Sequence, residues 1–410
     1  NMIWQALAYS GDAHVINVTA PERESRAAES RPAAAPAQPA ATEYGRADMQ
    51  TAYVAPGTAI EQALAEVWSA VLGIDPIGVH DNFFELRGDS LLALQLVARL
   101  HERFQVAVPM RSIFETPTVA ELAETIDALR GPSAEHAPAV PASLVRLQPH
   151  GNKRPFFCIH PSGGIGACYA GLARLLDPDQ PFYAVEALGV DGTQLPRTSI
   201  QDMARAYIQD IRTVQPEGPY LLGGWSMGGS IAFEMAQQLK AAGHEVDLLV
   251  LIDTQAKPTG APPSEIDDVD LVATMLGAEM QLDRDLLLGH DTDTQLAILL
   301  EKAQAARILP QHFALEQFRR VIHTFRTHTQ AWWDYRPGPY AGYLTVLKAE
   351  ETIGDEDLAW REVTAADVEV HRIPGNHQTL ILPPQLDALA RQLDACLKAV
   401  QEPVGIGQDW

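Results

Sequence analysis

The chain has 410 residues, which is enough for two or three domains, and 46% of them are hydrophobic, which suffices for a sizeable core. A formal net charge of −23 argues against a nucleic-acid-binding protein, because that function needs a basic face. No stretch approaches the roughly 18 consecutive apolar residues of a membrane span. The three cysteines lack the paired spacing of a metal or disulfide framework, so we expect a cytoplasmic protein.

Two segments rich in Ala and Pro divide the chain, at residues 27–42 and 131–143. Such segments cannot bury a core, and we expect them to be extended linkers. Residues 1–51 would then hold the tail of an upstream domain, with a short strand at 14–18, followed by the first linker. The first residue is Asn and no cationic start or long apolar run follows it, so we expect a piece of a larger protein without a secretory signal.

Residues 52–130 have the periodicity of a small helical bundle. Gly73 is a plausible stop for the first helix, whose apolar side chains recur at spacings of three and four. These side chains belong to Ile60, Leu64, Val67, Trp68, Val71 and Leu72. Further helices are expected to begin at Ser90 and near Arg111, and another is expected over 119–129.

Residues 144–410 alternate short apolar runs with helical patterns, which is the signature of a mostly parallel sheet with crossover helices. Strands are expected at 156–159, 182–185, 220–223, 248–252, 344–347 and 368–372. Residues 258–330 interrupt this rhythm with several expected helices and no strand, so we expect them to cover the active site. Their aromatic side chains would either line a substrate channel or pack the lid itself. These residues are Phe313, Phe318 and Phe325, with Trp332 and Trp333 just beyond.

Ser90 lies in the segment FFELRGDSLL at residues 83–92. This segment resembles the acyl or peptidyl carrier domains of nonribosomal peptide and polyketide synthases, and the resemblance extends over 52–130. It implies a four-helix bundle, 4′-phosphopantetheine attached to Ser90 by a phosphopantetheinyl transferase, and upstream synthase modules as partners. Arg87 stands where the family more often has Gly.

The physical chemistry agrees with a carrier role. A serine at a helix start offers free N–H groups and the positive end of the helix dipole to a phosphate. In isolation, the Asp-Ser pair before an apolar run would more simply be a helix cap.

The segment Gly224-Trp225-Ser226-Met227-Gly228 lies between an expected strand and an expected helix, as a nucleophile elbow requires. A serine hydroxyl needs a base, and the base needs an orienting acid. His377, in the loop after the strand at 368–372, is the candidate base. The spacing leaves the acid open between two sites: Asp253, after the strand at 248–252, and Glu350 or Glu351, after the next strand. Asp247 is expected at the wrong end of the sheet.

Residues 145–400 resemble the type I thioesterases that terminate peptide and polyketide synthases. The resemblance implies an α/β-hydrolase fold with a helical lid, and Asp253 as the acid. The backbone N–H of Met227 is one expected donor to the oxyanion. The second, by resemblance, is the N–H of Ser162, in a segment similar to the family's His-Pro-x-Gly-Gly. His160 opens that segment, and we interpret it as a structural histidine.

The combined hypothesis is chain-terminating release of a carrier-bound acyl or peptidyl thioester through an acyl-Ser226 intermediate. Hydrolysis, macrocyclisation and transfer to another acceptor are all open as outcomes. The alternatives are a stand-alone serine esterase or lipase, an acyltransferase with an accessory helical domain, and a non-catalytic binding module. We expect no metal, nucleic acid or membrane as a partner.

Overall fold

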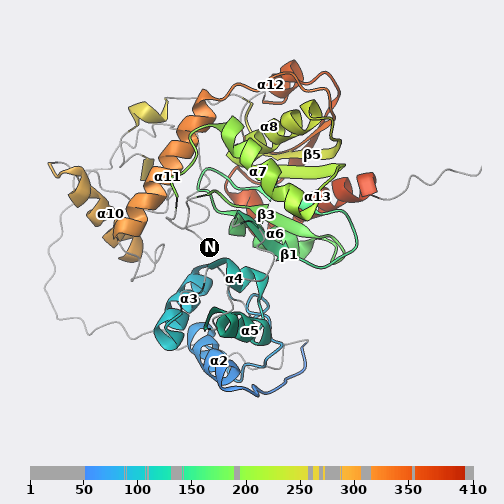
Figure 1. Cartoon of the computed structure of the whole chain (residues 1–410). Coiled ribbons are helices and arrows are strands. Elements are labelled where there is room, and N and C mark those ends of the chain that lie inside the picture. The colour runs from blue at the N-terminus through green and yellow to red at the C-terminus, as the bar shows by residue number, and fades with distance from the viewer. Residues whose placement is uncertain are drawn as a thin grey trace, which may run out of the picture.

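The structure is a computed structural model that describes most of the chain beyond its first fifty residues. The described residues are 51–86, 88, 90–106, 108, 110–130, 141, 143–188, 194–256, 262–266, 271–272, 287, 289–305, 315–352 and 356–401. The expected upstream tail, the first linker and nearly all of the second linker lie outside these residues. A small helical bundle lies beside a larger body built on a sheet, and further helices extend from one side of that body (Figure 1).

The bundle consists of four helices within the described part of 51–130. These helices are α2 (Ala59–Leu72), α3 (Ser90–Phe104), α4 (Met110–Glu115) and α5 (Val119–Arg130). Helix α2 begins at a capping box, in which the side chains of Thr58 and Glu61 each accept from the other's backbone N–H, and ends at Gly73 with φ 70°. The fully buried Trp68 packs edge-on against Phe83, with ring centroids 5.1 Å apart. The expected four-helix bundle is confirmed.

The body contains a seven-stranded sheet with the order β1-β3-β2-β4-β5-β6-β7. The strands are β1 (Leu144–Gln148), β2 (Phe156–Ile159), β3 (Phe182–Val185), β4 (Tyr220–Trp225), β5 (Val246–Ile252), β6 (Leu344–Ala349) and β7 (Val368–Ile373). Every neighbouring pair is parallel except β1 and β3. All six expected strands are present. Strand β1 is missing from the prediction, because this edge strand has a mixed pattern of buried and exposed residues.

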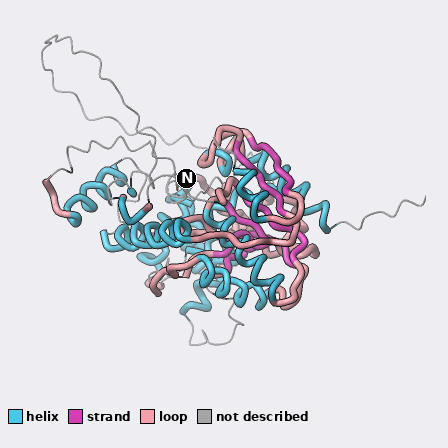
Figure 2. The backbone as a smooth tube through the Cα atoms, turned by 90° about the horizontal axis from the view of Figure 1, so that it is seen from above, coloured by secondary structure: helices cyan, strands magenta, loops and turns pink. Residues whose placement is uncertain are grey.

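Helices cover both faces of the sheet (Figures 1 and 2). One face carries α7 (Ile200–Val214), α8 (Met227–Ala241) and α12 (Glu356–Val363), and the other carries α6 (Ala170–Leu175) and α13 (Leu386–Gln401). Short 3-10 turns, η2 (Gly166–Tyr169) and η5 (Thr379–Ile381), precede α6 and α13. Successive residues of β4 point to opposite layers, as in Leu221 and Leu222. The fold is therefore the expected α/β-hydrolase type.

The described part of 258–330 is mostly helical and contains no strand, as expected of a lid. It contains η3 (Pro263–Glu265), α10 (Thr292–Ala305) and α11 (Leu315–Asp334). Phe318 and Phe325 of α11 pack in a hydrophobic cluster that α10 shares, whereas Trp332 packs in the core of the body. These three aromatic residues are therefore packing residues. Trp333 is half-buried, and Phe313 lies outside the described residues.

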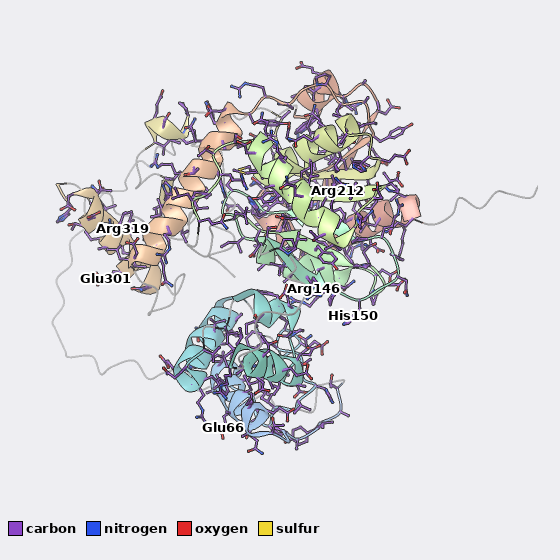
Figure 3. All side chains as sticks on the ribbon, in the orientation of Figure 1. Glu66, Arg146, His150, Arg212, Glu301 and Arg319 are labelled. Atoms are coloured by element: carbon purple, nitrogen blue, oxygen red, sulfur yellow. The ribbon has the colours of Figure 1, made fainter. Side chains whose placement is uncertain are left out.

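The bundle contacts the body through α4 and the loop before α3. Phe114 of α4 is buried in the cluster that α6 and α13 form on the sheet. Its ring stacks on that of Phe84 at 5.0 Å between centroids, and the guanidinium carbon of Arg174 on α6 lies 5.0 Å from the centroid of Phe84. Arg146 of β1 lies on the side of the body near the bundle, and Glu66 lies on the far side of the bundle (Figure 3).

Candidate active site

Ser226 occupies the sharp turn between β4 and α8. Its φ of 59° and ψ of −131° lie in a region that residues with a side chain rarely adopt, and the residue is 4% exposed. The turn requires glycine on both sides. A Cβ at Gly224 would lie 2.3 Å from the carbonyl carbon of Gly228, and a Cβ at Gly228 would lie 2.2 Å from the carbonyl oxygen of Ile159. Strand, turn and helix together have the form of a nucleophile elbow.

Asp253 directly follows β5, which is the parallel neighbour of β4, so it lies at the same edge of the sheet as Ser226. Its Oδ1 accepts a hydrogen bond from the backbone N–H of Ala349 at 2.9 Å. Its Oδ2 accepts from the Thr352 hydroxyl at 2.9 Å and from His377 Nδ1 at 2.7 Å. Burial alone would raise the pKa of Asp253, but the His377 contact and the other two hydrogen bonds together hold that pKa below its usual value. The carboxylate is therefore ionised and fixed in position.

His377 lies in the loop between β7 and η5. An ionised carboxylate only accepts hydrogen bonds, so the 2.7 Å contact with Asp253 places a proton on Nδ1 of the imidazole. The imidazole also contacts the indole of Trp225, the residue immediately before Ser226, with ring centroids 5.3 Å apart. The structure thus brings Asp253 and His377 together beside the turn that carries Ser226.

The other carboxylates considered for the acid lie elsewhere. Glu350 and Glu351 are exposed, and Glu351 Oε2 lies 3.4 Å from the side-chain amide of Asn376. Asp247 lies near the opposite end of β5, where it forms an ion pair of 2.6 Å with Arg154. The Asp253 carboxylate is the one that contacts the imidazole of His377.

The loop after β2 lies directly against the elbow. The close approach of Gly228 to the Ile159 carbonyl leaves no room for a side chain between them. The Tyr169 hydroxyl donates to the same carbonyl at 2.7 Å and accepts from the N–H of Trp225 at 3.0 Å. This bridging hydroxyl fixes the end of β2 relative to the end of β4.

The two expected oxyanion donors come from these adjoining segments. Ser162 is fully buried in the loop, and Met227 is the first residue of α8. His160 is also fully buried, and its Nε2 lies 2.7 Å from the Tyr207 hydroxyl. That contact agrees with its interpretation as a structural histidine.

Ser90 is the first residue of α3, a helix of 15 residues with no acidic residue in its first turn. The positive end of the helix dipole at this turn is a favourable place for a phosphate. Gly88 approaches Phe83 so closely that an added Cβ would lie 2.4 Å from the Phe83 carbonyl oxygen. The side chain of Ser90, together with Arg87 and Asp89, lies outside the described residues.

A family model described as "Thioesterase domain" matches residues 154–397, more than half of the chain. The chain belongs to the thioesterase domain family. A second model, described as "Phosphopantetheine attachment site", matches residues 62–126. The thioesterase domain is thus preceded by a carrier domain whose cofactor is 4′-phosphopantetheine, as the resemblance implies.

Relatives of this thioesterase and carrier pair are much longer synthetases. The chain is 34% identical to a dimodular nonribosomal peptide synthase of Bacillus subtilis over 85% of its own length and 14% of that protein. It is 30% identical to malpibaldin synthetase of Mortierella alpina over 85% of its own length and 6% of that protein. It also resembles the crystal structure of holo-AB3403, a four-domain nonribosomal peptide synthetase. The TM-score is 0.59 and the identity 29%, over 85% of this chain and 27% of that one.

Some residues around the thioesterase site have no distinct signal in the sequence. Thr352, which holds Asp253, follows β6 at the sheet edge that also carries the end of β5. The sequence signal for this role of Thr352 is weak: it is a residue with a hydroxyl group just beyond that strand. His328, in the middle of α11, contacts the loop after β2 across 166 positions of sequence, and nothing local predicts it.

Among the described helices, none is long and apolar enough to cross a membrane.

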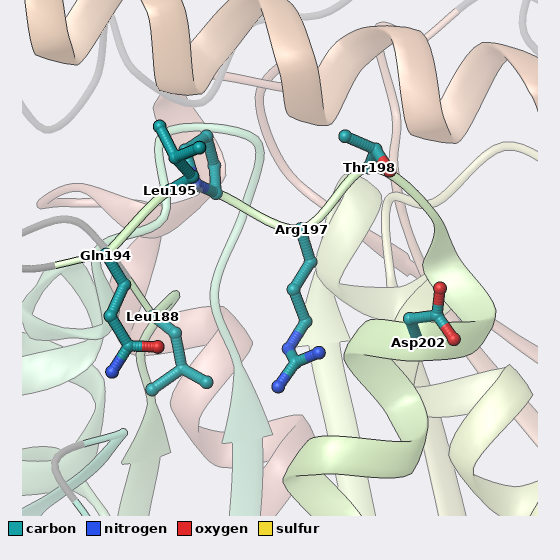
Figure 4. A pocket seen from close by; sticks show the side chains of 7 residues that line it. Leu188, Gln194, Leu195, Arg197, Thr198 and Asp202 are labelled. Atoms are coloured by element: carbon teal, nitrogen blue, oxygen red, sulfur yellow. The ribbon is translucent and has the colours of Figure 1, made fainter.

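A pocket of about 250 Å³ lies between the segment after β3 and the start of α7 (Figure 4). Its lining residues are Leu188, Gln194, Leu195, Pro196, Arg197, Thr198 and Asp202. The exposed guanidinium of Arg197 extends into the middle of this group (Figure 4). The sequence gives no signal for this pocket of the thioesterase domain.

Proposed function

We propose that this thioesterase releases an acyl or peptidyl chain from the carrier domain that precedes it, through an acyl ester on Ser226. The proposal is carried by one observation: a hydrogen-bonded Asp253–His377 pair beside the elbow, in a chain that also holds a carrier domain. Such release would end the assembly of a nonribosomal peptide or a polyketide. Upstream modules of the same synthase would supply the chain.

In the first step, Ser226 Oγ attacks the carbonyl carbon of the thioester while His377 Nε2 takes the hydroxyl proton. Because Nδ1 carries the hydrogen donated to Asp253, Nε2 of the neutral ring is the nitrogen with the lone pair that takes this proton. The C–S bond then breaks, the proton on His377 passes to the departing thiolate, and the acyl group remains on Ser226. The ionised Asp253 stabilises the imidazolium that exists between these events.

The negative charge on the carbonyl oxygen needs donors that are in place before the reaction. We assign this role to the backbone N–H groups of Met227 and Ser162. The close approach of Gly228 to the Ile159 carbonyl supports the assignment, because it keeps the two segments adjacent.

In the second step, water or a hydroxyl or amine of the acyl chain itself attacks the ester. His377 takes the proton of the attacking group and returns it to Ser226 Oγ. Attack by water gives a free acid, and attack by the chain gives a macrocycle. Exclusion of water by the lid would favour the macrocycle.

The cofactor 4′-phosphopantetheine supplies the thiol that bears the chain as a thioester, and Ser90 is the residue proposed to hold it. A phosphopantetheinyl transferase would attach it. Residues 52–130 contain eleven acidic residues against five arginines and no lysine, which suits a basic surface on that transferase. A flexible tether raises the effective concentration of the thioester at Ser226 without tight docking.

We also propose that the carrier domain spans 52–130 and the thioesterase domain 144–410. Separate hydrophobic clusters in the bundle and in the body support this division. A cytoplasmic location is proposed because all three cysteines are free, as in a reducing compartment.

The test loads the full chain with an acylated pantetheine, using a phosphopantetheinyl transferase and an acyl-CoA, and follows the bound mass over time. Wild type should lose the acyl mass, whereas Ser226→Ala should retain it, with release slowed at least about 10³-fold. Ser199→Ala, at the exposed start of α7, is the matched control and should release normally. Ser90→Ala should accept no load.

Unchanged release by Ser226→Ala would refute the proposal. Two other outcomes would identify a different enzyme. Hydrolysis of simple esters with no release from the carrier indicates an esterase, and release only when an acceptor is added indicates an acyltransferase.

A further inference from the structure

Two buried histidines meet at the loop of residues 160–164 and have no part in the proposed reaction. His160 belongs to the loop, and His328 comes from the middle of α11. They are 0% and 1% exposed, respectively. Their rings are stacked, with centroids 5.2 Å apart and planes at 24°. A pair of buried imidazoles is costly unless both are neutral and hydrogen-bonded.

Each imidazole donates to a backbone carbonyl of the loop. His160 Nδ1 lies 2.8 Å from the carbonyl oxygen of Pro161, and His328 Nδ1 lies 2.9 Å from that of Ser162. A carbonyl only accepts, so both rings carry their hydrogen on Nδ1. Nε2 of His160 then accepts from the Tyr207 hydroxyl at 2.7 Å. Burial is the main reason why the pKa of His160 falls to about 3 and that of His328 to about 4, which keeps both neutral.

These contacts fix the direction of the loop's N–H groups. In a trans peptide, the carbonyl of one residue and the N–H of the next point in opposite directions. The Pro161 carbonyl accepts from His160 Nδ1 and also from the N–H of Gly164 at 2.9 Å, and these two bonds together aim the N–H of Ser162, the proposed oxyanion donor. The bond from His328 to the Ser162 carbonyl fixes the following peptide plane as well. The loop cannot turn either peptide without breaking a buried hydrogen bond, which leaves a buried polar group without its partner.

Helix α11 connects this loop to the lid. Phe318, Ile322 and Phe325 of α11 pack in the lid cluster, whereas Ala331 and Trp332 pack in the core of the body. His328 lies between these two groups on the same helix. A displacement of the lid that moved α11 would therefore act on the Ser162 carbonyl.

We propose that His328 is a positioning residue that makes the oxyanion-binding geometry of the loop depend on the place of lid helix α11. The inference rests on the proposed function, because it takes Ser162 as an oxyanion donor. It adds a route by which the lid, when it is seated over a bound chain, sets the reactivity of the site. By thermodynamic reciprocity, filling the oxyanion site must in turn stabilise α11.

Two substitutions separate the hydrogen bond from the packing. In His328→Asn, the side-chain amide nitrogen takes nearly the place of Nδ1 and keeps the donor. In His328→Leu, the side chain has a similar volume but no hydrogen-bond donor. Steady-state hydrolysis of a soluble acyl thioester by the full chain should show kcat about 10- to 100-fold lower in His328→Leu with little change in KM. His328→Asn should recover to within about threefold.

A second readout does not depend on turnover. An alkylboronic acid forms a tetrahedral adduct with a serine hydroxyl and places an oxygen in the oxyanion site. Its dissociation constant should rise at least about tenfold in His328→Leu and recover in His328→Asn. Hydrogen exchange in α11 should slow on adduct formation in wild type and in His328→Asn, but not in His328→Leu.

A folded His328→Leu variant with wild-type kcat and boronate affinity would overturn the inference. So would a His328→Asn variant impaired as strongly as His328→Leu, because packing alone would then explain the effect. If Ser226→Ala still releases the chain, it is the proposed function that fails. An inactive Ser226→Ala beside an unimpaired His328→Leu leaves the proposed function intact and rejects only the lid coupling.

Discussion

The buried histidine of α11 should make the stability of the thioesterase domain depend on pH. Burial lowers the pKa of His328 to about 4, although the hydrogen bond to the Ser162 carbonyl partly opposes this shift. In the unfolded chain, a histidine has a pKa of about 6.5. Below pH 6.5, the unfolded chain therefore takes up a proton that the folded protein does not bind.

The sign and size of the effect follow from this difference in proton uptake. The contribution to stability is fully present above pH 6.5 and is lost as the pH falls toward 4. The slope is about 1.4 kcal/mol per pH unit in that window. Between pH 7 and pH 5, His328 alone should lower the free energy of unfolding by about 2 kcal/mol. His160, with a pKa of about 3, should lower it by a similar amount.

The assay is urea unfolding at pH 7 and pH 5, followed by tryptophan fluorescence, for wild type, His328→Asn and His328→Leu. Neither variant carries a titrating group at this position. Both should therefore lose about 2 kcal/mol less than wild type on acidification. His328→Leu should be the less stable of the two at pH 7, because the Ser162 carbonyl lacks its donor. Equal losses in all three proteins would refute the neutral, buried state of His328.

Three further changes test the site and its surroundings. Thr352→Val removes one hydrogen bond to the Asp253 carboxylate, and kcat/KM for a soluble thioester should fall about tenfold; an unchanged value would contradict the orienting role. Arg174→Ala combined with Phe84→Ala removes the cation–π contact, and the radius of gyration from X-ray scattering should increase; no increase would mean that other contacts hold the bundle. Gly228→Ala should abolish fluorophosphonate labelling, because its Cβ would meet a backbone carbonyl; wild-type labelling would contradict the packing of the elbow.

Local patterns predicted the parts of the fold that are continuous in sequence. The strand, turn and helix around Ser226 follow from apolar runs and flanking glycines, and the structure has the same order. Helix α2 follows from the spacing of its apolar residues, and its end follows from Gly73. Strand β1 escaped prediction because it is short, lies at an edge and alternates only partly.

Contacts between distant segments were beyond the reach of local pattern. Spacing could not choose between Asp253 and the glutamates after β6, and the family resemblance was needed. The physical reason for the difference appears only in three dimensions, where Asp253 is buried and held by Thr352, whereas Glu350 is exposed. The place of His328 depends on how α11 crosses the body, which no local pattern specifies.

Helix α11 divides its side chains between two hydrophobic clusters. Mutations in the outer cluster, around Phe318 and α10, can alter the shape of the lid without touching the residues that pack around Ser226. Related chains can therefore diversify what they accept while inheriting the same reacting groups. Substitutions in α11 at His328 or beyond it would begin to affect the residues that carry out the reaction.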